Sequence, residues 1–158
     1  MVQRLIETRS GGPGGTGFPV GVMVILIVED EALVAMDVAA TLEGFGHEVC
    51  GIAAGQAEAL RLGRLHHPDV ALVDLALADG RTGLAITREL RERHGTVCIL
   101  TTAYPREMWP EGRHGAWAWL GKPYSVEKLG KVLEYCLALA EGPAPAQALP
   151  SGLEVLTN

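Results

Sequence analysis

The sequence predicts an α/β fold in which a five-stranded parallel sheet is covered on both faces by helices. Two observations lead to this fold class. From Val22 onward, short runs rich in β-branched residues alternate with longer segments of helical period, as in βαβ units. The chain has 158 residues, of which 48% are hydrophobic and 20% charged, and these values suit one folded domain with a sizeable core.

Five strands are predicted from short apolar runs that end at polar or turn-forming residues. The first run, VILIV, is followed directly by Glu29 and Asp30, and the third, VALV, is followed by Asp74. Continuous apolar runs of this kind are typical of parallel strands that are buried on both faces. We expect strands near residues 22–28, 48–53, 70–74, 97–101 and 117–120.

The segments between the strands have the spacing of amphipathic helices. In the last segment, apolar residues recur at i, i+3 and i+4 from Val126 to Leu137, so one face is expected to pack on the sheet. One helix is expected to be short or irregular because Pro105 and Pro110 lie in it or beside it, and proline inside a helix costs about 3 kcal/mol. We expect helices near residues 31–43, 55–66, 83–94, 106–113 and 125–140.

Composition divides the chain into three predicted segments. Residues 10–17 read SGGPGGTG, which buries little apolar surface and behaves as flexible coil. After Glu141 the sequence is rich in proline and alanine, and no output domain fits there. We therefore expect a flexible glycine-rich extension at 1–21, one folded domain at 22–141 and a Pro/Ala-rich tail at 142–158.

Charge, hydropathy and cysteine usage argue against several classes of protein. The net charge of −6 and the pI near 5.3, without a Lys/Arg cluster, argue against nucleic-acid binding. The apolar run at 20–28 is shorter than the roughly 20 residues that a membrane span needs. Three widely spaced cysteines form neither a disulfide framework nor a zinc motif, and they suit a reducing compartment. We expect a cytoplasmic protein that binds neither nucleic acid nor membrane.

Polar side chains follow four of the five predicted strands at the point where each strand ends. They are, in chain order, Glu29 with Asp30, Asp74, Thr101 with Thr102, and Lys122. In open α/β sheets, ligands bind at the carboxyl ends of the strands, so these side chains are expected to converge although they are far apart in sequence.

Each of these residues has an ordinary structural explanation when it is taken alone. Asp30 could cap the next helix, Thr102 could be a turn residue, and Lys122 could be a solvated surface charge. Asp74 is harder to explain in this way, because an acid within an apolar run is costly to bury without a partner. Together they favour a functional site over separate structural roles.

The residue types fit phosphoryl transfer to an aspartate. Mg²⁺ prefers oxygen ligands and is commonly held by one or two carboxylates plus phosphate oxygens, which suits Asp30 and Asp74. A carboxylate can attack phosphorus and form an aspartyl phosphate. Mg²⁺, Lys122 and the hydroxyl of Thr102 could then stabilise the charge on the phosphoryl oxygens.

Residues 22 to about 140 resemble the receiver domain of two-component response regulators. The matching motifs are ILIVEDE, LVDLAL, LTTAY and GKPY. The resemblance implies a doubly wound, flavodoxin-like (βα)5 fold with the strand order 2-1-3-4-5. It also implies a phosphoacceptor signalling protein that assists its own phosphorylation and dephosphorylation, and not an enzyme.

The motif matches imply a role for each carboxylate. Asp74 becomes the phosphoacceptor and a ligand of Mg²⁺. Asp30 becomes a direct ligand of the metal, and Glu29 acts through water. The backbone carbonyl of Ala76 completes the protein ligands of the metal.

Three further roles follow from the same resemblance. Thr102, which is followed by alanine as the family pattern requires, and Lys122 contact the phosphoryl group. The bond before Pro123 is expected to be cis. Trp119, three residues before the lysine, is either a switch residue that moves on phosphorylation or a packing residue, and the sequence does not decide between them.

The resemblance implies a sensor histidine kinase or a histidine phosphotransfer protein as the phosphoryl donor, and a protein as the downstream target; a homodimer is left open. A stand-alone receiver could relay the phosphoryl group or act as an effector. Two rival functions are kept. A pseudo-receiver would bind partners without being phosphorylated, and a phosphatase of the haloacid dehalogenase type would need a second Asp where Ala76 stands.

Overall fold

The sheet of the protein has six strands in a computed structural model that describes residues 21–105, 108, 115–141 and 153–155. The strands are β1 (Val24–Val28), β2 (Glu48–Ala53), β3 (Val70–Asp74), β4 (Val97–Thr102), β5 (Ala118–Gly121) and β6 (Leu153–Val155). Their order is β2-β1-β3-β4-β5-β6. The first five are parallel, which confirms the predicted order 2-1-3-4-5, whereas β6 was not predicted and pairs antiparallel with β5.

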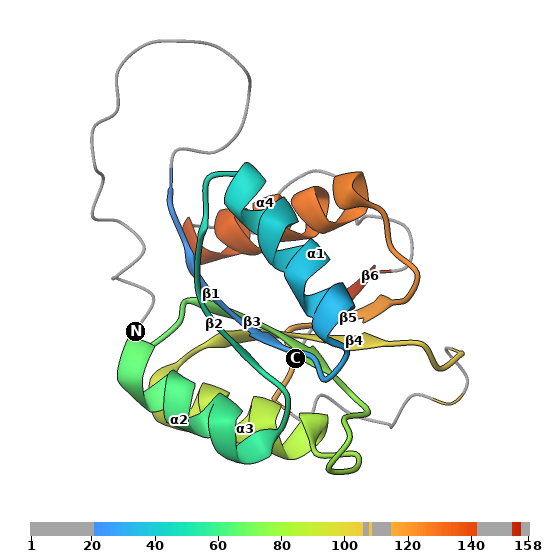
Figure 1. Ribbon diagram of the computed structural model, residues 1–158. Coiled ribbons are helices and arrows are strands. Elements are labelled where there is room, and N and C mark those ends of the chain that lie inside the picture. Colours follow the sequence, from blue (N-terminus) through green and yellow to red (C-terminus); the bar gives the residue numbers. More distant parts are fainter. Residues whose placement is uncertain (1–20, 106–107, 109–114, 142–152, 156–158) are drawn as a thin grey trace, which may run out of the picture.

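In the described part of the chain, four helices cover the two faces of the sheet. They are α1 (Ala32–Gly44), α2 (Gln56–His66), α3 (Gly83–His94) and α4 (Val126–Glu141). Figure 1 shows α1 and α4 on one face and α2 and α3 on the other, as in a doubly wound fold. A helix capable of spanning a bilayer is not found among the described residues. Apart from residue 108, the helix predicted near 106–113 lies outside the described residues, and so do the extension up to residue 20 and all of the tail except β6.

The hydrophobic core has two layers because successive residues of a strand point to opposite faces of the sheet. In β1, Ile25 and Ile27 belong to the layer under α1 and α4, while Leu26 and Val28 belong to the layer under α2 and α3. Val126, at the start of the face predicted for the last helix, is 57% exposed, whereas four apolar residues further along this face are buried in the first layer. These residues are Leu129, Val132, Leu133 and Cys136.

Candidate functional site

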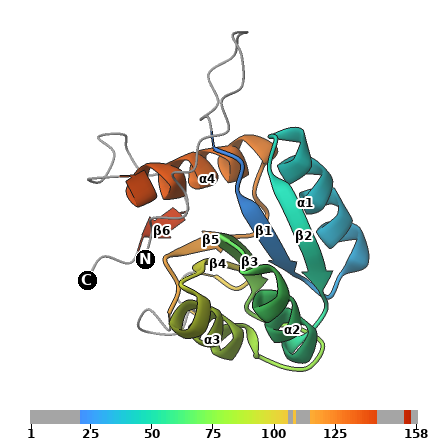
Figure 2. The same ribbon diagram turned by 90° about the vertical axis from the view of Figure 1, so that its left-hand side faces the viewer.

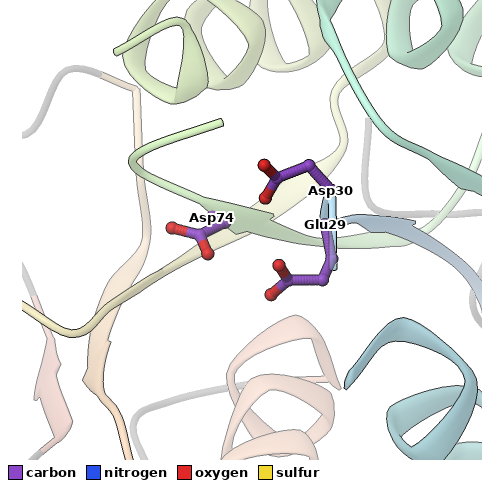
Figure 3. A group of neighbouring side chains, drawn as sticks. All are labelled: Glu29, Asp30 and Asp74. Carbon is purple, nitrogen blue, oxygen red and sulfur yellow. The ribbon is translucent and has the colours of Figure 1, made fainter. Parts of the chain in front are cut away.

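Three acidic side chains meet at the carboxyl ends of β1 and β3. Glu29 and Asp30 follow β1, and Asp74 is the last residue of β3. One carboxylate oxygen from each lies within 4.8 Å of the others, and Figure 3 shows the three groups facing a common space. β1 and β3 are neighbours in the sheet, which brings residues 29 and 74 together. The predicted convergence of these acids is therefore observed in the fold.

Burial differs within this acidic cluster. Glu29 and Asp74 are 6% and 8% exposed, whereas Asp30 is the more accessible of the three. Burial disfavours an ionised carboxylate, and it raises the pKa of Glu29 even though the ammonium of Lys122 and the backbone N–H of Glu31 act in the opposite direction. The cluster is thus a place where negative charge is unfavourable unless a cation is near.

Lys122 supplies the positive charge that the structure places in this cluster. Its Nζ lies 2.6 Å from Oε2 of Glu29 and 2.6 Å from Oδ2 of Asp74. Burial lowers the pKa of this lysine, but the hydrogen bonds and charges of the two carboxylates outweigh that effect and hold the pKa above its usual value. The lysine therefore remains charged. The cluster has three carboxylates and this ammonium group contacts two of them, so net negative charge is left in the cluster.

The loop after β3 holds Asp74 in place by its backbone. The other carboxylate oxygen, Oδ1, accepts a hydrogen bond from the N–H of Ala76 at 3.0 Å. Gly83, the first residue of α3, packs directly on this segment. A Cβ at position 83 would overlap the carbonyl oxygen of Asp74 and lie 2.8 Å from Cα of Leu75. Only glycine permits this close approach of α3 to the end of β3.

Thr102 lies at the carboxyl end of β4, next to β3. Its neighbour Thr101 pairs with Asp74 in the sheet, and Thr102 follows one residue later. The hydroxyl oxygen of Thr102 accepts a hydrogen bond from the N–H of Tyr104 at 3.0 Å, and its carbonyl oxygen accepts one from the N–H of Lys122 at 2.7 Å. Since a threonine hydroxyl can accept and donate at once, its proton is still available for a ligand.

Trp119 is buried in the sheet layer under α2 and α3, with 1% of its surface exposed. It pairs with Leu100 in β4, and Thr102 lies two residues beyond Leu100, so Trp119 and Thr102 share one face of the sheet. The burial of Trp119 suits a packing residue. Trp119 also lies close to the carboxyl end of β4, where Thr102 stands. The choice between packing and switching stays a prediction. The bond between Lys122 and Pro123 is cis.

Two residues of the loop between β3 and α3 were missed by the sequence analysis. Asp79 accepts hydrogen bonds from the N–H of Gln56 at 2.8 Å and from the hydroxyl of Thr82 at 2.6 Å, which ties the loop to the start of α2. Both hydrogen bonds lower the pKa of Asp79. The guanidinium carbon of Arg81 lies 4.8 Å from the ring centroid of Tyr104.

The donor set of the acidic cluster fits a hard divalent cation. Its oxygens come from carboxylates, which Mg²⁺ prefers, and net negative charge remains after pairing with Lys122. Asp30 is accessible enough to bind a partly hydrated ion. The role of the Ala76 carbonyl stays a prediction, since the observed contact of this residue is through its N–H.

A groove of about 500 Å³ lies beside the cluster. Val34 and Val38 of α1 form one side, and Lys122 and Tyr124 form another. On the same helix, Leu33 and Met36 are 83% and 62% exposed. These two residues are three positions apart, so they lie on the same side of α1 and leave apolar surface exposed near the groove.

Comparison with known proteins gives a family match over most of the chain. Residues 25–134 match the response regulator receiver domain. The phyllosphere-induced regulator PhyR of Methylorubrum extorquens is 35% identical over 114 residues, which are 72% of this chain and 43% of that protein. The transcriptional regulatory protein PdtaR of Mycobacterium tuberculosis is 34% identical over 116 residues, covering 72% of this chain and 56% of that protein. The chain spans about half the length of these relatives.

Solved structures give the same result for the fold. The response regulator PhyR from Brucella abortus has a TM-score of 0.67 at 31% identity, covering 76% of this chain and 49% of that one. A CheY-like receiver domain protein from Methanospirillum hungatei has a TM-score of 0.68 at 28% identity, covering 76% and 97%. A PhyR structure from Bartonella quintana, described as an anti-anti-sigma factor, has a TM-score of 0.66 at 27% identity, covering 76% and 50%.

Proposed function

Because this chain belongs to the family of response regulator receiver domains, we propose that it accepts a phosphoryl group on Asp74 from a histidine kinase or a histidine phosphotransfer protein. Receiver domains are signalling modules of two-component systems rather than conventional enzymes. Residues 22–141 form this module in the proposal, and it acts in the cytoplasm. Phosphorylation switches the binding of a downstream protein or passes the phosphoryl group on. The convergence of Lys122 with three carboxylates carries the proposal.

Asp74 is the nucleophile in this proposal. One of its carboxylate oxygens forms a bond to phosphorus while the bond from phosphorus to the donor's histidine nitrogen breaks, and the imidazole leaves. Before the transfer, the ammonium of Lys122 contacts Oδ2 of Asp74 directly. After the transfer the same ammonium neutralises charge on the phosphoryl oxygens.

Thr102 provides a hydrogen-bond donor for the transferred group. Its hydroxyl oxygen is already engaged by the N–H of Tyr104, which fixes the position of the oxygen while the proton stays free to rotate toward a phosphoryl oxygen. The carbonyl of Thr102 also accepts the N–H of Lys122, so the two groups that would contact the phosphoryl group are joined by one backbone hydrogen bond. Trp119, on the same face of the sheet, is the proposed switch residue.

Mg²⁺ is the proposed cofactor of the acidic cluster. When bound, it supplies positive charge that neutralises phosphoryl oxygens during transfer. Asp30 and Asp74 would hold it directly, Glu29 through water, and Ala76 through its carbonyl. The carboxylate of Glu29 contacts Lys122 in the structure, and in the proposal it also faces the hydrated ion.

The groove beside Lys122 is the proposed docking surface for the phosphoryl donor. A donor histidine must reach Asp74, and the exposed Leu33 and Met36 of α1 offer apolar contacts to a donor bound next to the groove. A downstream protein as the target is in keeping with the Bartonella relative, whose described role as an anti-anti-sigma factor is one of acting on other proteins.

Incubation with acetyl phosphate and Mg²⁺, followed by intact-mass measurement, tests the proposal. Wild type is expected to gain the mass of one phosphoryl group, and Asp74→Asn none. Asp37→Asn is the matched control, because Asp37 is an acid of the nearby groove that lies outside the acidic cluster. It should gain the same mass as wild type.

Intact mass and an assay of phosphate release together separate the rival functions. A pseudo-receiver would show no added mass in wild type. A phosphatase would release phosphate from small phosphate esters continuously, which Ala76 disfavours because no acid follows the nucleophile by two residues to assist turnover.

A further inference from the structure

The segments that follow Asp74 and Thr102 are joined by a contact between Arg81 and Tyr104. The guanidinium carbon of Arg81 lies 4.8 Å from the centroid of the Tyr104 ring, within the range of a cation–π interaction. Arg81 belongs to the loop between β3 and α3, and Tyr104 stands two residues after the end of β4. The contact therefore bridges the segments that follow two neighbouring strands of the sheet.

Both ends of the loop between β3 and α3 are attached to Asp74. At the start of the loop, Ala76 donates its N–H to Oδ1 of Asp74 at 3.0 Å. At its end, Gly83 packs so closely on the carbonyl oxygen of Asp74 that a Cβ would overlap this oxygen. The loop and the proposed nucleophile are thus held in one arrangement.

The middle of this loop is held by a turn and by Asp79. Leu77 and Gly80 exchange two main-chain hydrogen bonds of 2.9 Å, and the φ of Gly80 is 112°, a value that favours glycine. Asp79 accepts hydrogen bonds from the first backbone N–H of α2 and from the hydroxyl of Thr82. Figure 2 shows α2 beside α3, the helix that the loop enters. Arg81 lies between Gly80 and Thr82, so its backbone is fixed on both sides although the residue is exposed.

Tyr104 is hydrogen-bonded to the side chain of Thr102. Its backbone N–H donates to Oγ1 of Thr102 at 3.0 Å, and its own side chain is packed, partly buried, against the core layer under α2 and α3. Because Arg81 lies over the Tyr104 ring, the loop that is attached to Asp74 also contacts the residue that is bonded to the Thr102 hydroxyl. One chain of contacts therefore runs from the carboxylate to the hydroxyl.

We propose that Arg81 is a positioning residue for the phosphorylation of Asp74, and that it acts through Tyr104 by holding the hydroxyl of Thr102 at the phosphoryl site. The inference rests on the proposed function, since the rate of group transfer depends on the placement of the groups that contact the transferred phosphoryl. Arg81 does not contact the phosphodonor in this role. The effect of its loss should therefore depend on the Tyr104 ring and not on ionic strength.

The rate of phosphorylation of the full-length chain by acetyl phosphate and Mg²⁺ tests this role. Arg81→Gln is expected to react about two- to fivefold more slowly than wild type, the fold-change that corresponds to an exposed cation–π contact. Arg81→Lys should recover most of the rate, because an ammonium group can also lie over an aromatic ring. Arg61→Gln is the matched control and should react as wild type does, since Arg61 is an exposed arginine that pairs with Glu58 on α2.

A double-mutant cycle with Tyr104→Leu shows whether Arg81 acts through the ring. Arg81→Gln should slow the reaction of the wild-type chain and should not slow that of Tyr104→Leu any further. A guanidinium that instead attracted the anionic donor would lower the rate equally in both backgrounds, and its effect would fade at high salt. Either of these two results would overturn the proposal.

Amide hydrogen exchange by NMR, without a phosphodonor, supplies a measurement that does not depend on the proposed function. The Tyr104 amide should exchange about two- to fivefold faster in Arg81→Gln than in wild type and Arg81→Lys. The Leu77 amide, which bonds to Gly80, should be equally protected in all three proteins and shows that the loop stays folded.

The two proposals fail in different ways. Equal exchange of the Tyr104 amide in Arg81→Gln and wild type, or equal rates of phosphorylation, would overturn the role of Arg81 alone. The absence of added phosphoryl mass in wild type would overturn the proposed function, and with it the role of Arg81 in the transfer.

Discussion

The Nζ atom of Lys122 lies 2.6 Å from Oδ2 of Asp74, although β4 separates β3, which carries the aspartate, from β5, which leads to the lysine. The two side chains meet above the carboxyl end of β4, and both are largely buried. A buried ion pair of this kind contributes little net stability, because desolvation of both charges offsets their attraction. The presence of this ion pair at the end of the sheet is therefore better explained by a role in the chemistry of Asp74 than by a role in stability.

Replacing the lysine should therefore impair phosphorylation more than folding. Lys122→Gln is expected to slow the reaction with acetyl phosphate and Mg²⁺ on the order of 100-fold, the effect typical of removing one donor from a charged transition state. A time course of intact mass measures the rate. Lys131→Gln is the control, because Lys131 is an exposed lysine that pairs with Glu127 on α4. Equal rates for the two variants would contradict the role of Lys122.

The raised pKa of Glu29 leads us to expect that the free energy of unfolding depends on pH. Burial is the largest cause that raises its pKa above the ordinary 4.5. A group whose pKa is raised on folding favours the folded state below its ordinary pKa, and this contribution is lost as the pH rises through the folded pKa. Without Mg²⁺, Glu29→Gln should therefore have a higher free energy of unfolding than wild type at pH 7, and the difference should shrink toward pH 4.

Urea unfolding at several pH values measures this difference. Glu127→Gln is the control, since the pKa of Glu127 is lowered by its hydrogen bond to Lys131, so the sign of the pH effect should be opposite. A Glu29→Gln variant that is less stable than wild type at pH 7 would show that the contact with Lys122 outweighs burial.

Mg²⁺ should stabilise the folded protein through the acidic cluster. A ligand that binds only the folded state raises the unfolding temperature with its concentration. We expect Mg²⁺ to raise the Tm of wild type, and Asp30→Asn to reduce this rise because one carboxylate of the cluster is lost. Thermal unfolding over a Mg²⁺ titration measures both, with Asp37→Asn as the control. An equal response of Asp30→Asn and wild type would place the metal elsewhere.

Gly83→Ala should be destabilising because the added Cβ meets backbone and not a flexible side chain. It would overlap the carbonyl oxygen of Asp74 and crowd Cα of Leu75, so α3 must move away from the end of β3. We expect a loss of about 1–3 kcal/mol in the free energy of unfolding, as for overpacked sites. Gly44→Ala is the matched control, since an added Cβ there would meet no atom within 4 Å apart from its chain neighbours and the backbone of its own helix. Equal stability of the two variants would contradict the packing.

The parallel sheet and the acidic cluster could be predicted because both depend on local sequence. Each buried strand is a short apolar run, and Glu29, Asp30 and Asp74 stand where two of these runs end. The strand order placed the two ends side by side, although it came from the resemblance of four motifs and not from periodicity. Lys122 was expected to converge with these acids because it follows another predicted strand, whereas its direct contact with Asp74 was not predicted.

Other features could not be predicted because they depend on contacts between distant segments. β6 is three residues long, and nothing in Leu153–Val155 marks it as the partner of β5. The hydrogen bond from Gln56 to Asp79 joins residues 23 positions apart, and Asp79 has no motif around it. Such contacts can be recognised only in the folded structure, where the sheet places the loops next to one another.

Reductive trapping of the phosphorylated protein tests the central claim most directly. Borohydride reduces an aspartyl phosphate to homoserine, and peptide mapping by mass spectrometry then identifies the position. After incubation with acetyl phosphate and Mg²⁺, we predict homoserine in place of Asp74 and unchanged Glu29 and Asp30. Reduction at either of those acids, or an unmodified Asp74 in protein that has gained the phosphoryl mass, would contradict the account.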